Sequence, residues 1–400
     1  MSKFINYFLF LSIFSTLLVA SNLKVDINRV LDEFNIPNTA ANRDLIATLQ
    51  DEITSSDIDS FIDIVGSKYY HVSMIKSELD AINAPEFLLF LAMTESRLLN
   101  SATSAKKAGG MWQFMPRTAR VFGLRIDEYV DERRDPFAST DAAFRYLNSL
   151  QSMFDKWYIS IMAYNCGQGC MRKAIRTANS NDLSALFEPG TLPKETRFFL
   201  RKIIKHFMIA QNPQIRELLD SSKKQLKLSK IAVKSGTKLS DVSKSIDISI
   251  SDMKYYNPHI KKNISPKNST QYYFYIPSSK VETYIASLSQ DEKREVIRVT
   301  EYRTHTVKQG ETITEIAKSW DISMIDLVRE NELTSSQLTP DQKIQIPIKK
   351  VELDTKKYEV QKGDTLIGIS NKFSVNLNLL LATNNIKSSK IIVGDVIVIP

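Results

Sequence analysis

The chain has 400 residues, of which 43% are hydrophobic and 24% are charged, and its formal net charge is +8. These values are typical of globular proteins and exclude a largely disordered chain, a collagen and a polytopic membrane protein. At about 150 residues per domain, the length predicts two to four domains. Two cysteines and four scattered histidines exclude a disulfide framework and argue against a histidine-based metal site, and we expect no metal and no cofactor.

The N-terminus has the pattern of a secretory signal. Lys3 precedes an apolar run over residues 8–20, and small residues follow at Ala20 and Ser21. This pattern predicts a signal peptide over residues 1–21, because the run is shorter than the roughly 20 residues that span a membrane. The alternative is an uncleaved anchor, which would associate the protein with a membrane. Either outcome predicts a periplasmic or cell-envelope protein. We expect no nucleic-acid partner, since no phosphate-binding loop is present.

Residues 22–60 predict a helical extension of unknown role, and residues 61–220 predict a helical domain. Pro85 opens an apolar helix over residues 87–93, and Glu95 lies near its end. Burial in such surroundings raises the pKa of a carboxyl group and keeps it protonated, as a general acid requires. The alternative for Glu95 is a solvent-facing carboxylate or an ion pair with Arg97.

Glycine is scarce, with 12 residues in the chain, and its positions mark loops with special backbone needs. Gly109 and Gly110 precede Gln113, and Gly167 follows Tyr164 and Asn165. Such loops on a helical scaffold commonly carry function. Pro116 predicts a helix start with Gly123 at its end, and Asp135-Pro136 predicts another helix start.

The C-terminal half contains repeats. Residues 305–320 match residues 358–373 at an offset of 53, and both copies end in Ile-Pro. A degenerate third copy precedes them, with Gly236 and Asn257 at the same mutual spacing. Each copy reads as strand, helix, helix, strand, because alternating strand residues flank apolar residues at helical spacing. The predicted units cover residues 229–278, 304–348 and 357–400.

These βααβ units resemble LysM domains, more specifically in the last two copies than in the first. The resemblance implies binding of glycans that contain N-acetylglucosamine, between the first strand–helix turn and the loop after the second helix. The alternative is that the glycine and threonine residues of this turn serve only as turn and helix-cap residues. The implied glycan-binding residues are Gly310, Glu311, Thr312, Ile313, Gly363, Asp364, Thr365 and Leu366.

The helical region resembles the lytic transglycosylases in four ordered motifs. These are Glu95-Ser96, the Gly-Met-Trp-Gln stretch with Ser104 upstream, the Ala-Tyr-Asn stretch at residues 163–165, and residues 193–197. The resemblance covers residues 60–215 and, with the LysM copies, residues 230–400. It implies a multidomain protein with a mainly α, goose-lysozyme-like catalytic domain followed by small βααβ LysM domains.

The resemblance implies cleavage of the β-1,4 bond between N-acetylmuramic acid and N-acetylglucosamine in peptidoglycan, leaving 1,6-anhydro ends. Glu95 would protonate the bridging oxygen and then accept the proton of the attacking C6 hydroxyl. Tyr164 would hydrogen-bond Glu95 or a sugar substituent, and Trp112 would pack either on a sugar or in the core. The implied substrate-binding residues are Ser104, Gln113, Tyr164 and Asn165.

Two rival functions stay open. A hydrolytic muramidase needs a second carboxylate to activate water. A non-catalytic peptidoglycan-binding protein needs no carboxylate. We expect a monomer whose partner is the peptidoglycan glycan strand. The candidates for the second carboxylate are Asp127, Asp131, Asp135 and Glu188.

Cys166 and Cys170 depart from the family pattern. An oxidising compartment favours a disulfide between them, whereas a bridge from i to i+4 within a helix is geometrically awkward. The sequence therefore leaves both a disulfide and two unlinked thiols open.

Overall fold

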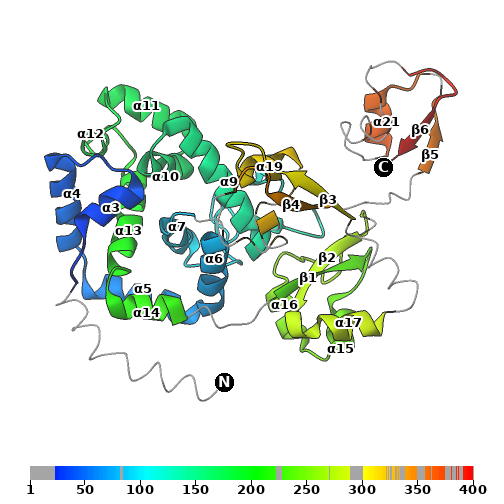
Figure 1. Cartoon of the computed structure of the whole chain (residues 1–400), viewed down its shortest axis with the longest axis horizontal. Helices are drawn as coiled ribbons and strands as arrows, with labels where there is room; N and C mark the ends of the chain where they lie inside the picture. Colours follow the sequence, from blue (N-terminus) through cyan, green and yellow to red (C-terminus); the bar gives the residue numbers. More distant parts are fainter. Residues whose placement is uncertain are drawn as a thin grey trace.

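The computed structural model describes residues 23–81, 84–221, 228–269, 271–288, 301–320, 338–348, 356–361, 363–373 and 391–399, with seven single residues and the pair 327–328 between these ranges (Figure 1). The predicted signal peptide lies outside them. A helical domain comes first and small strand-containing modules follow, as the sequence predicts. Its helices are α3 (Ile27–Phe34), α4 (Ala40–Asp51), α5 (Ser55–Ser67), α6 (Tyr69–Ala81), α7 (Phe87–Ser96), α8 (Pro116–Val121), η1 (Glu132–Arg134), α9 (Pro136–Phe154), α10 (Trp157–Cys166), α11 (Gln168–Ala178), α12 (Leu183–Leu186), α13 (Lys194–Ile209) and α14 (Pro213–Ser221).

The helices before residue 61 pack into the core of the helical domain. Phe34 of α3 is fully buried, with its ring centroid 5.3 Å from that of Phe87 and 5.5 Å from that of Phe207. Helix α5 runs across residue 61 without a break. Residues 27–67 therefore supply part of the wall that buries α7.

Helix α7 is the central helix of this domain. Residues 87–93 are all buried, and the helix packs against α6 and α13. A helix that is apolar on every side needs neighbours on every side. The helix ends at Arg97, whose φ of 55° is left-handed. Glu95 thus lies in the last turn, where the buried helix reaches the surface.

The predicted helix starts are confirmed. Pro116 is the first residue of α8, and Gly123 follows its end with a φ of 83°. The Asp135 side chain accepts hydrogen bonds from the main-chain N–H groups of Phe137 and Ala138 at the start of α9. Pro suits a first helical position because its missing N–H has no partner there in any case.

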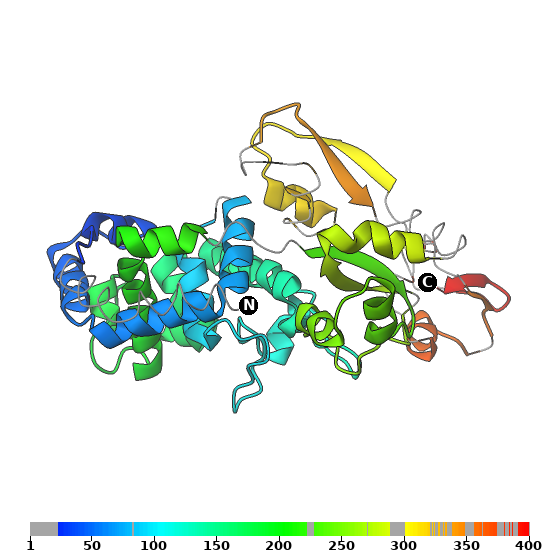
Figure 2. The ribbon, with the colours of Figure 1, turned by 90° about the horizontal axis from the view of Figure 1, so that it is seen from below.

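Three antiparallel two-stranded sheets form the modules within the described residues. The first module shows the predicted order of strand, helix, helix and strand, and it adds a third helix. Figure 2 shows it beside the helical domain. The second helices predicted for the other two modules lie largely outside the described residues. The modules comprise β1 (Leu228–Lys234), α15 (Leu239–Ser245), α16 (Ile250–Tyr256), β2 (Gln271–Pro277), η3 (Ser278–Lys280) and α17 (Val281–Ser287); β3 (Glu301–Thr306), α19 (Ile313–Ser319) and β4 (Lys343–Ile348); and β5 (Lys356–Glu359), α21 (Leu366–Lys372) and β6 (Val396–Ile399).

The loop before α8 is packed directly on Arg133 of η1. Gly109 and Phe114 exchange main-chain hydrogen bonds of 3.0 and 3.1 Å. The guanidinium of Arg133 donates to the carbonyls of Lys107 and Phe114 at 2.8 and 3.1 Å. A Cβ on Gly110 would lie 1.7 Å from the Arg133 carbonyl oxygen, and the φ of Gly110 is 79°. The paired glycines are therefore required by this close approach.

Replacing Gly110 by Ala is expected to lower the free energy of unfolding by about 1–3 kcal/mol, because the backbone must shift away from Arg133. Urea denaturation measures this change. Gly169→Ala is the matched control, since Gly169 lies in a helix with no atom within 4 Å of the added methyl group. Equal stability of the two variants would contradict the packing described here.

Candidate active site

Glu95 lies half-buried in the last turn of α7. Its pKa is raised from 4.5 to about 8, first because burial penalises the charged form and second because the Glu195 carboxylate lies close enough to repel it. The carboxyl group is therefore largely protonated at neutral pH, the state that a general acid needs. The sequence predicted that burial raises the pKa of Glu95. It did not predict that the Glu195 carboxylate raises this pKa further.

The alternative pairing of Glu95 with Arg97 is wrong. Because the backbone turns left-handed at Arg97, its side chain leads away from the helix end. The guanidinium donates to the Asp63 carboxylate at 2.7 Å and to the Ser60 hydroxyl at 2.9 Å, both on α5. Glu95 is thus left without the cation that would stabilise its charged form.

Tyr164 lies beside Glu95 at the end of α10. Burial raises its pKa well above 10, and the Glu95 carboxyl adds to the effect. The expected hydrogen bond to Glu95 is not what the structure shows, because the Tyr164 hydroxyl donates to the Trp112 carbonyl at 2.7 Å. Tyr164 therefore connects α10 with the loop that carries Gln113.

Gln113 follows Trp112 with a left-handed φ of 48°. Its side-chain amide donates to the Gly110 carbonyl at 2.7 Å and is only partly buried. The Trp112 ring is 1% exposed, and its indole N–H donates to Thr140 at 3.0 Å. Of the two readings of Trp112, core packing is right and sugar stacking is wrong.

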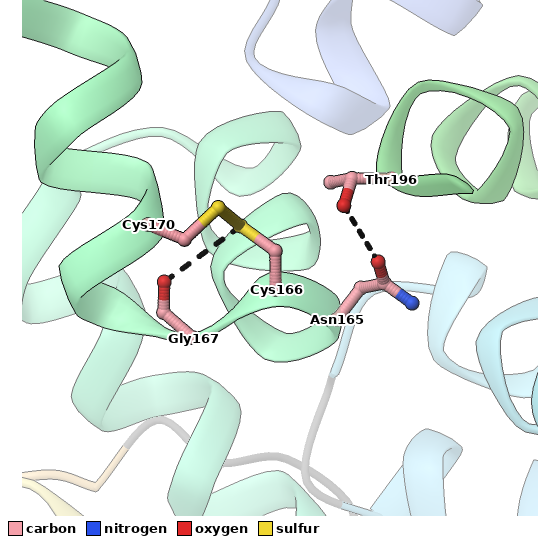
Figure 3. Close-up of a disulfide and its surroundings, with 5 residues drawn as sticks. All are labelled: Asn165, Cys166, Gly167, Cys170 and Thr196. Atoms are coloured by element: carbon pink, nitrogen blue, oxygen red, sulfur yellow. Dashed lines mark hydrogen bonds between the residues drawn. A yellow bond between two sulfur atoms is a disulfide. The ribbon is translucent and has the colours of Figure 1, made fainter. Parts of the chain in front are cut away.

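Asn165 is held by Thr196 of α13, whose hydroxyl donates to the Asn165 amide oxygen at 2.8 Å (Figure 3). Cys166 and Cys170 form a disulfide with a Cα–Cα distance of 5.8 Å. The bridge does not lie within one helix, because α10 ends at Cys166 and Gly167, with a φ of 88°, starts a new direction. This break removes the geometric objection to the i to i+4 bridge.

Ser104 forms a tight turn in the loop before Gln113. Its hydroxyl oxygen accepts from the Ala108 N–H at 3.0 Å, and its own N–H donates to the Ala108 carbonyl at 3.0 Å. Ser96, next to Glu95, donates to the Met111 carbonyl at 2.7 Å. The turn that carries Glu95 is thereby bonded to the same loop.

Ser96, beside Glu95, and Tyr164 therefore both bond the loop that carries Gln113. Asn165, next to Tyr164, is held from α13 by Thr196. The sequence reasoning missed Glu195, Thr196 and Ser96 as members of this site. Glu195 and Thr196 belong to the fourth motif, residues 193–197. They approach Glu95 and Asn165, which lie more than 30 residues earlier in the chain, only because the helices pack together.

The candidate glycan residues of the second and third modules are turn and cap residues. Gly310 and Gly363 have φ values of 78° and 94°. Thr312 and Glu315 bond each other's main-chain N–H groups, and Thr365 accepts from Gly368. The role of these residues in glycan binding stays a prediction. Glu311 accepts from Lys308 and contacts His305, Asp364 accepts from Gln361, and Ile313 and Leu366 are buried in the module cores.

Four parts of the chain match models of known families. Residues 73–187 match the transglycosylase SLT domain, residues 305–347 and 358–400 match the LysM domain, and residues 227–293 match the LysM-like domain of lytic transglycosylase MltD. The chain therefore contains a transglycosylase SLT domain followed by a LysM-like domain and two LysM domains.

It resembles membrane-bound lytic murein transglycosylase D of Escherichia coli K12, with 29% identity over 326 residues, which are 78% of this chain and 72% of that protein. Cell wall-binding protein YocH of Bacillus subtilis is 32% identical over 90 residues, which are 22% of this chain and 31% of that protein. Among solved structures, an inactive mutant of lytic transglycosylase Slt from Pseudomonas aeruginosa has a TM-score of 0.30 at 20% identity, covering 35% of this chain and 24% of that one.

Within the described part of the chain, no helix has the length and hydropathy that crossing a membrane requires.

The raised pKa of Glu95 predicts a pH-dependent cost to folding. Because its folded-state pKa of about 8 exceeds the ordinary 4.5, the folded protein holds this proton more tightly, and stability is lost as pH rises from about 4.5 through 8. Glu95→Gln escapes this loss, so it should stabilise the protein at pH 9 by roughly 1–3 kcal/mol, discounted for partial exposure, and far less at pH 4.

Thermal or urea unfolding at the two pH values measures the difference. Glu188→Gln is the matched control, since Glu188 is exposed. A Glu95→Gln variant that behaves like Glu188→Gln at both pH values would show that the Glu95 carboxyl is well solvated.

Proposed function

We propose that this protein cleaves peptidoglycan glycan strands by lytic transglycosylation, with Glu95 as both general acid and general base. The observation that carries the proposal is the raised pKa of the Glu95 carboxyl at the end of a buried helix. The protonated carboxyl gives its proton to the oxygen between N-acetylmuramic acid and N-acetylglucosamine. The bond between C1 and that bridging oxygen breaks, and N-acetylglucosamine leaves with a 4-hydroxyl group. The resulting carboxylate accepts the proton of the C6 hydroxyl of N-acetylmuramic acid as that hydroxyl oxygen bonds to C1. The product carries a 1,6-anhydro end, as expected of a glycosidic-bond lyase.

Polar side chains around Glu95 suit the substrate. The amides of Gln113 and Asn165 offer donors and acceptors for N-acetyl groups, and both are held by one side-chain bond. Ser104 lies upstream in the loop of Gln113 and completes the proposed substrate-binding set. Exposed apolar side chains lie shortly after Glu95, Gln113 and Thr196 in the chain. They offer surface for the apolar faces of sugar rings. These are Leu99, Met115 and Phe198.

A hydrolytic muramidase is the second candidate, because one carboxylate, Glu195, lies near Glu95. Three of the other carboxylates considered for activating water are engaged elsewhere. Asp127 and Asp131 pair with Arg125 and Arg133, and Asp135 caps α9 with no exposed surface. Glu188 is exposed.

We further propose that the protein acts in the periplasm or cell envelope as a monomer, tethered by its LysM modules. The match to LysM domains and the similarity to a membrane-bound transglycosylase support this location.

Glu95→Gln should lower the rate of cleavage of purified peptidoglycan at least about 10²-fold, since the variant carries no proton to donate. Mass spectrometry of the wild-type digest should show anhydro ends. Glu195→Gln separates the two candidates. A transglycosylase keeps its activity with the alkaline limb of the pH profile moved to lower pH, because a repelling charge is removed. A hydrolase that uses Glu195 loses activity and gives reducing ends.

Removal of residues 300–400 should weaken co-sedimentation with insoluble peptidoglycan about 10²-fold, because two linked modules are lost. Turnover of soluble, peptide-free glycan strands should stay within about twofold. A chain that lacks residues 351–400 should show an intermediate loss of sedimentation. An equal fall in soluble turnover would contradict a tethering role for these two modules.

A further inference from the structure

The first module is bonded to one segment of the helical domain, residues 125–135. Val130 forms an antiparallel bridge with Ile260, which follows α16. On either side, the Asp131 N–H donates to the His259 carbonyl at 2.9 Å, and the Lys261 N–H donates to the Tyr129 carbonyl at 2.7 Å. Both views show β1 and β2 close to the start of α9 (Figures 1 and 2). The two parts thus share main-chain hydrogen bonds as well as side-chain contacts.

The interface is also apolar at its centre. Val130 is 0% exposed, and it packs in the core of the module with Ile231, Ile260 and Phe274. The Phe137 ring of α9 lies 4.7 Å from that of Tyr275 on β2. Burial of a valine side chain in a neighbouring domain stabilises the contact, because its apolar surface is removed from water. Separation of the two parts would expose this side chain.

Two stacked tyrosines of β2 reach the carboxylates of the segment. The Tyr272 hydroxyl donates to Glu132 at 2.6 Å, and the Tyr273 hydroxyl donates to Asp135 at 2.7 Å. Asp135 is completely buried, and burial raises the pKa of Glu132. Hydrogen bonds to buried carboxylates are among the stronger ones in proteins. The module therefore supplies donors to one oxygen of each carboxylate, while the other oxygen accepts main-chain N–H groups of the helical domain.

The same segment supports the loop of Gln113. Asp131, next to Val130, binds the Arg133 guanidinium through two bonds of 2.8 Å. Arg133 in turn donates to the carbonyls of Lys107 and Phe114, and Gly110 packs on its main chain. A continuous series of bonds thus joins the module to the loop that holds Gln113.

The loop after α16 is also bonded within the module. The Ser265 N–H donates to the Thr237 carbonyl at 2.8 Å, and the Thr237 N–H donates to the Ser265 hydroxyl at 2.9 Å. The Leu239 N–H donates to the Asn263 carbonyl at 2.9 Å. On one side this loop thus closes against its own strand–helix turn, and on the other it binds the helical domain.

We propose that the first module, residues 228–288, is a positioning domain of the catalytic unit, in which Tyr272 and Tyr273 hold the segment that fixes the Gln113 loop. This inference rests on the proposed function for its effect on catalysis. The module docks onto its own catalytic domain, and attachment to the wall remains the proposed role of the second and third modules. Tyr272 and Tyr273 are positioning residues, since they act through Glu132, Asp135 and Arg133.

The decisive test is the double variant Tyr272→Phe/Tyr273→Phe in the full chain. Amide hydrogen exchange of residues 103–114 should become about tenfold faster, and kcat/KM on soluble, peptide-free glycan strands should fall about tenfold. Co-sedimentation with insoluble peptidoglycan should stay within about twofold. Tyr284→Phe is the matched control, because its hydroxyl donates within the module, to Ala232 at 3.2 Å.

A second pair of variants tests the apolar contact. Val130→Asp places a charge in the buried interface and should change exchange and turnover in the same direction and by a larger factor. Val121→Asp is its control, since Val121 is 74% exposed. Far-UV circular dichroism of Val130→Asp distinguishes undocking from unfolding, and if this variant unfolds, the tyrosine pair decides the question.

The proposal is overturned if the tyrosine double variant matches Tyr284→Phe in the exchange of residues 103–114, or if it lowers co-sedimentation and leaves exchange and turnover unchanged. Hydrogen exchange needs no substrate. A wild-type protein that yields no anhydro ends would therefore overturn the proposed function and leave the exchange result to decide the positioning role by itself.

Discussion

Poor solvation of one carboxyl group governs the chemistry that this protein can perform. Glu95 ends a helix whose preceding residues 87–93 are all buried, so protein replaces most of the water around its carboxyl. The nearest basic side chain in sequence, Arg97, is held by Asp63, and a second carboxylate, Glu195, adds repulsion. Each of these features favours the protonated form. This arrangement lowers the stability of the folded protein at high pH, because the unfolded chain would solvate the charged carboxylate of Glu95.

The polar groups near Glu95 are held by the main chain. Tyr164 and Ser96 both donate to carbonyls of the loop at residues 111–112, and Gln113 donates to Gly110. Asn165 is fixed from α13, and the Cys166–Cys170 disulfide closes the adjoining helix break. Such fixed groups lose little freedom when a substrate binds, which favours precise placement of the reacting bond.

The three modules differ in their contacts, and core residues of the second, such as Ile313 and Ile316, belong to the same hydrophobic cluster as the helical domain. The first buries Val130 of the helical domain in its own core and bonds two buried carboxylates. The third has its own small core of Val360, Leu366 and Ile369 with residues of β6. A loop that packs against the helical domain is not open to a glycan. A module that tethers the protein to the wall needs an open glycan-binding surface.

The sequence alone determined the features that depend on local signals. The apolar helix with Glu95 at its end, the helix starts at Pro116 and Asp135, and the repeated modules all follow from periodicity, caps and spacing within a few residues. These are short-range because a helix or turn is specified by its own residues.

Tertiary packing decided what those signals could not. The partner of Arg97, the buried place of Trp112, the approach of Glu195 to Glu95 and the docking of Val130 beside Ile260 join residues far apart in the chain. The disulfide depended on a helix break at Gly167 that the cysteine spacing does not reveal. Such contacts arise only when helices pack, since burial is non-directional and the periodicity of a sequence shows which face is buried but not what it packs against.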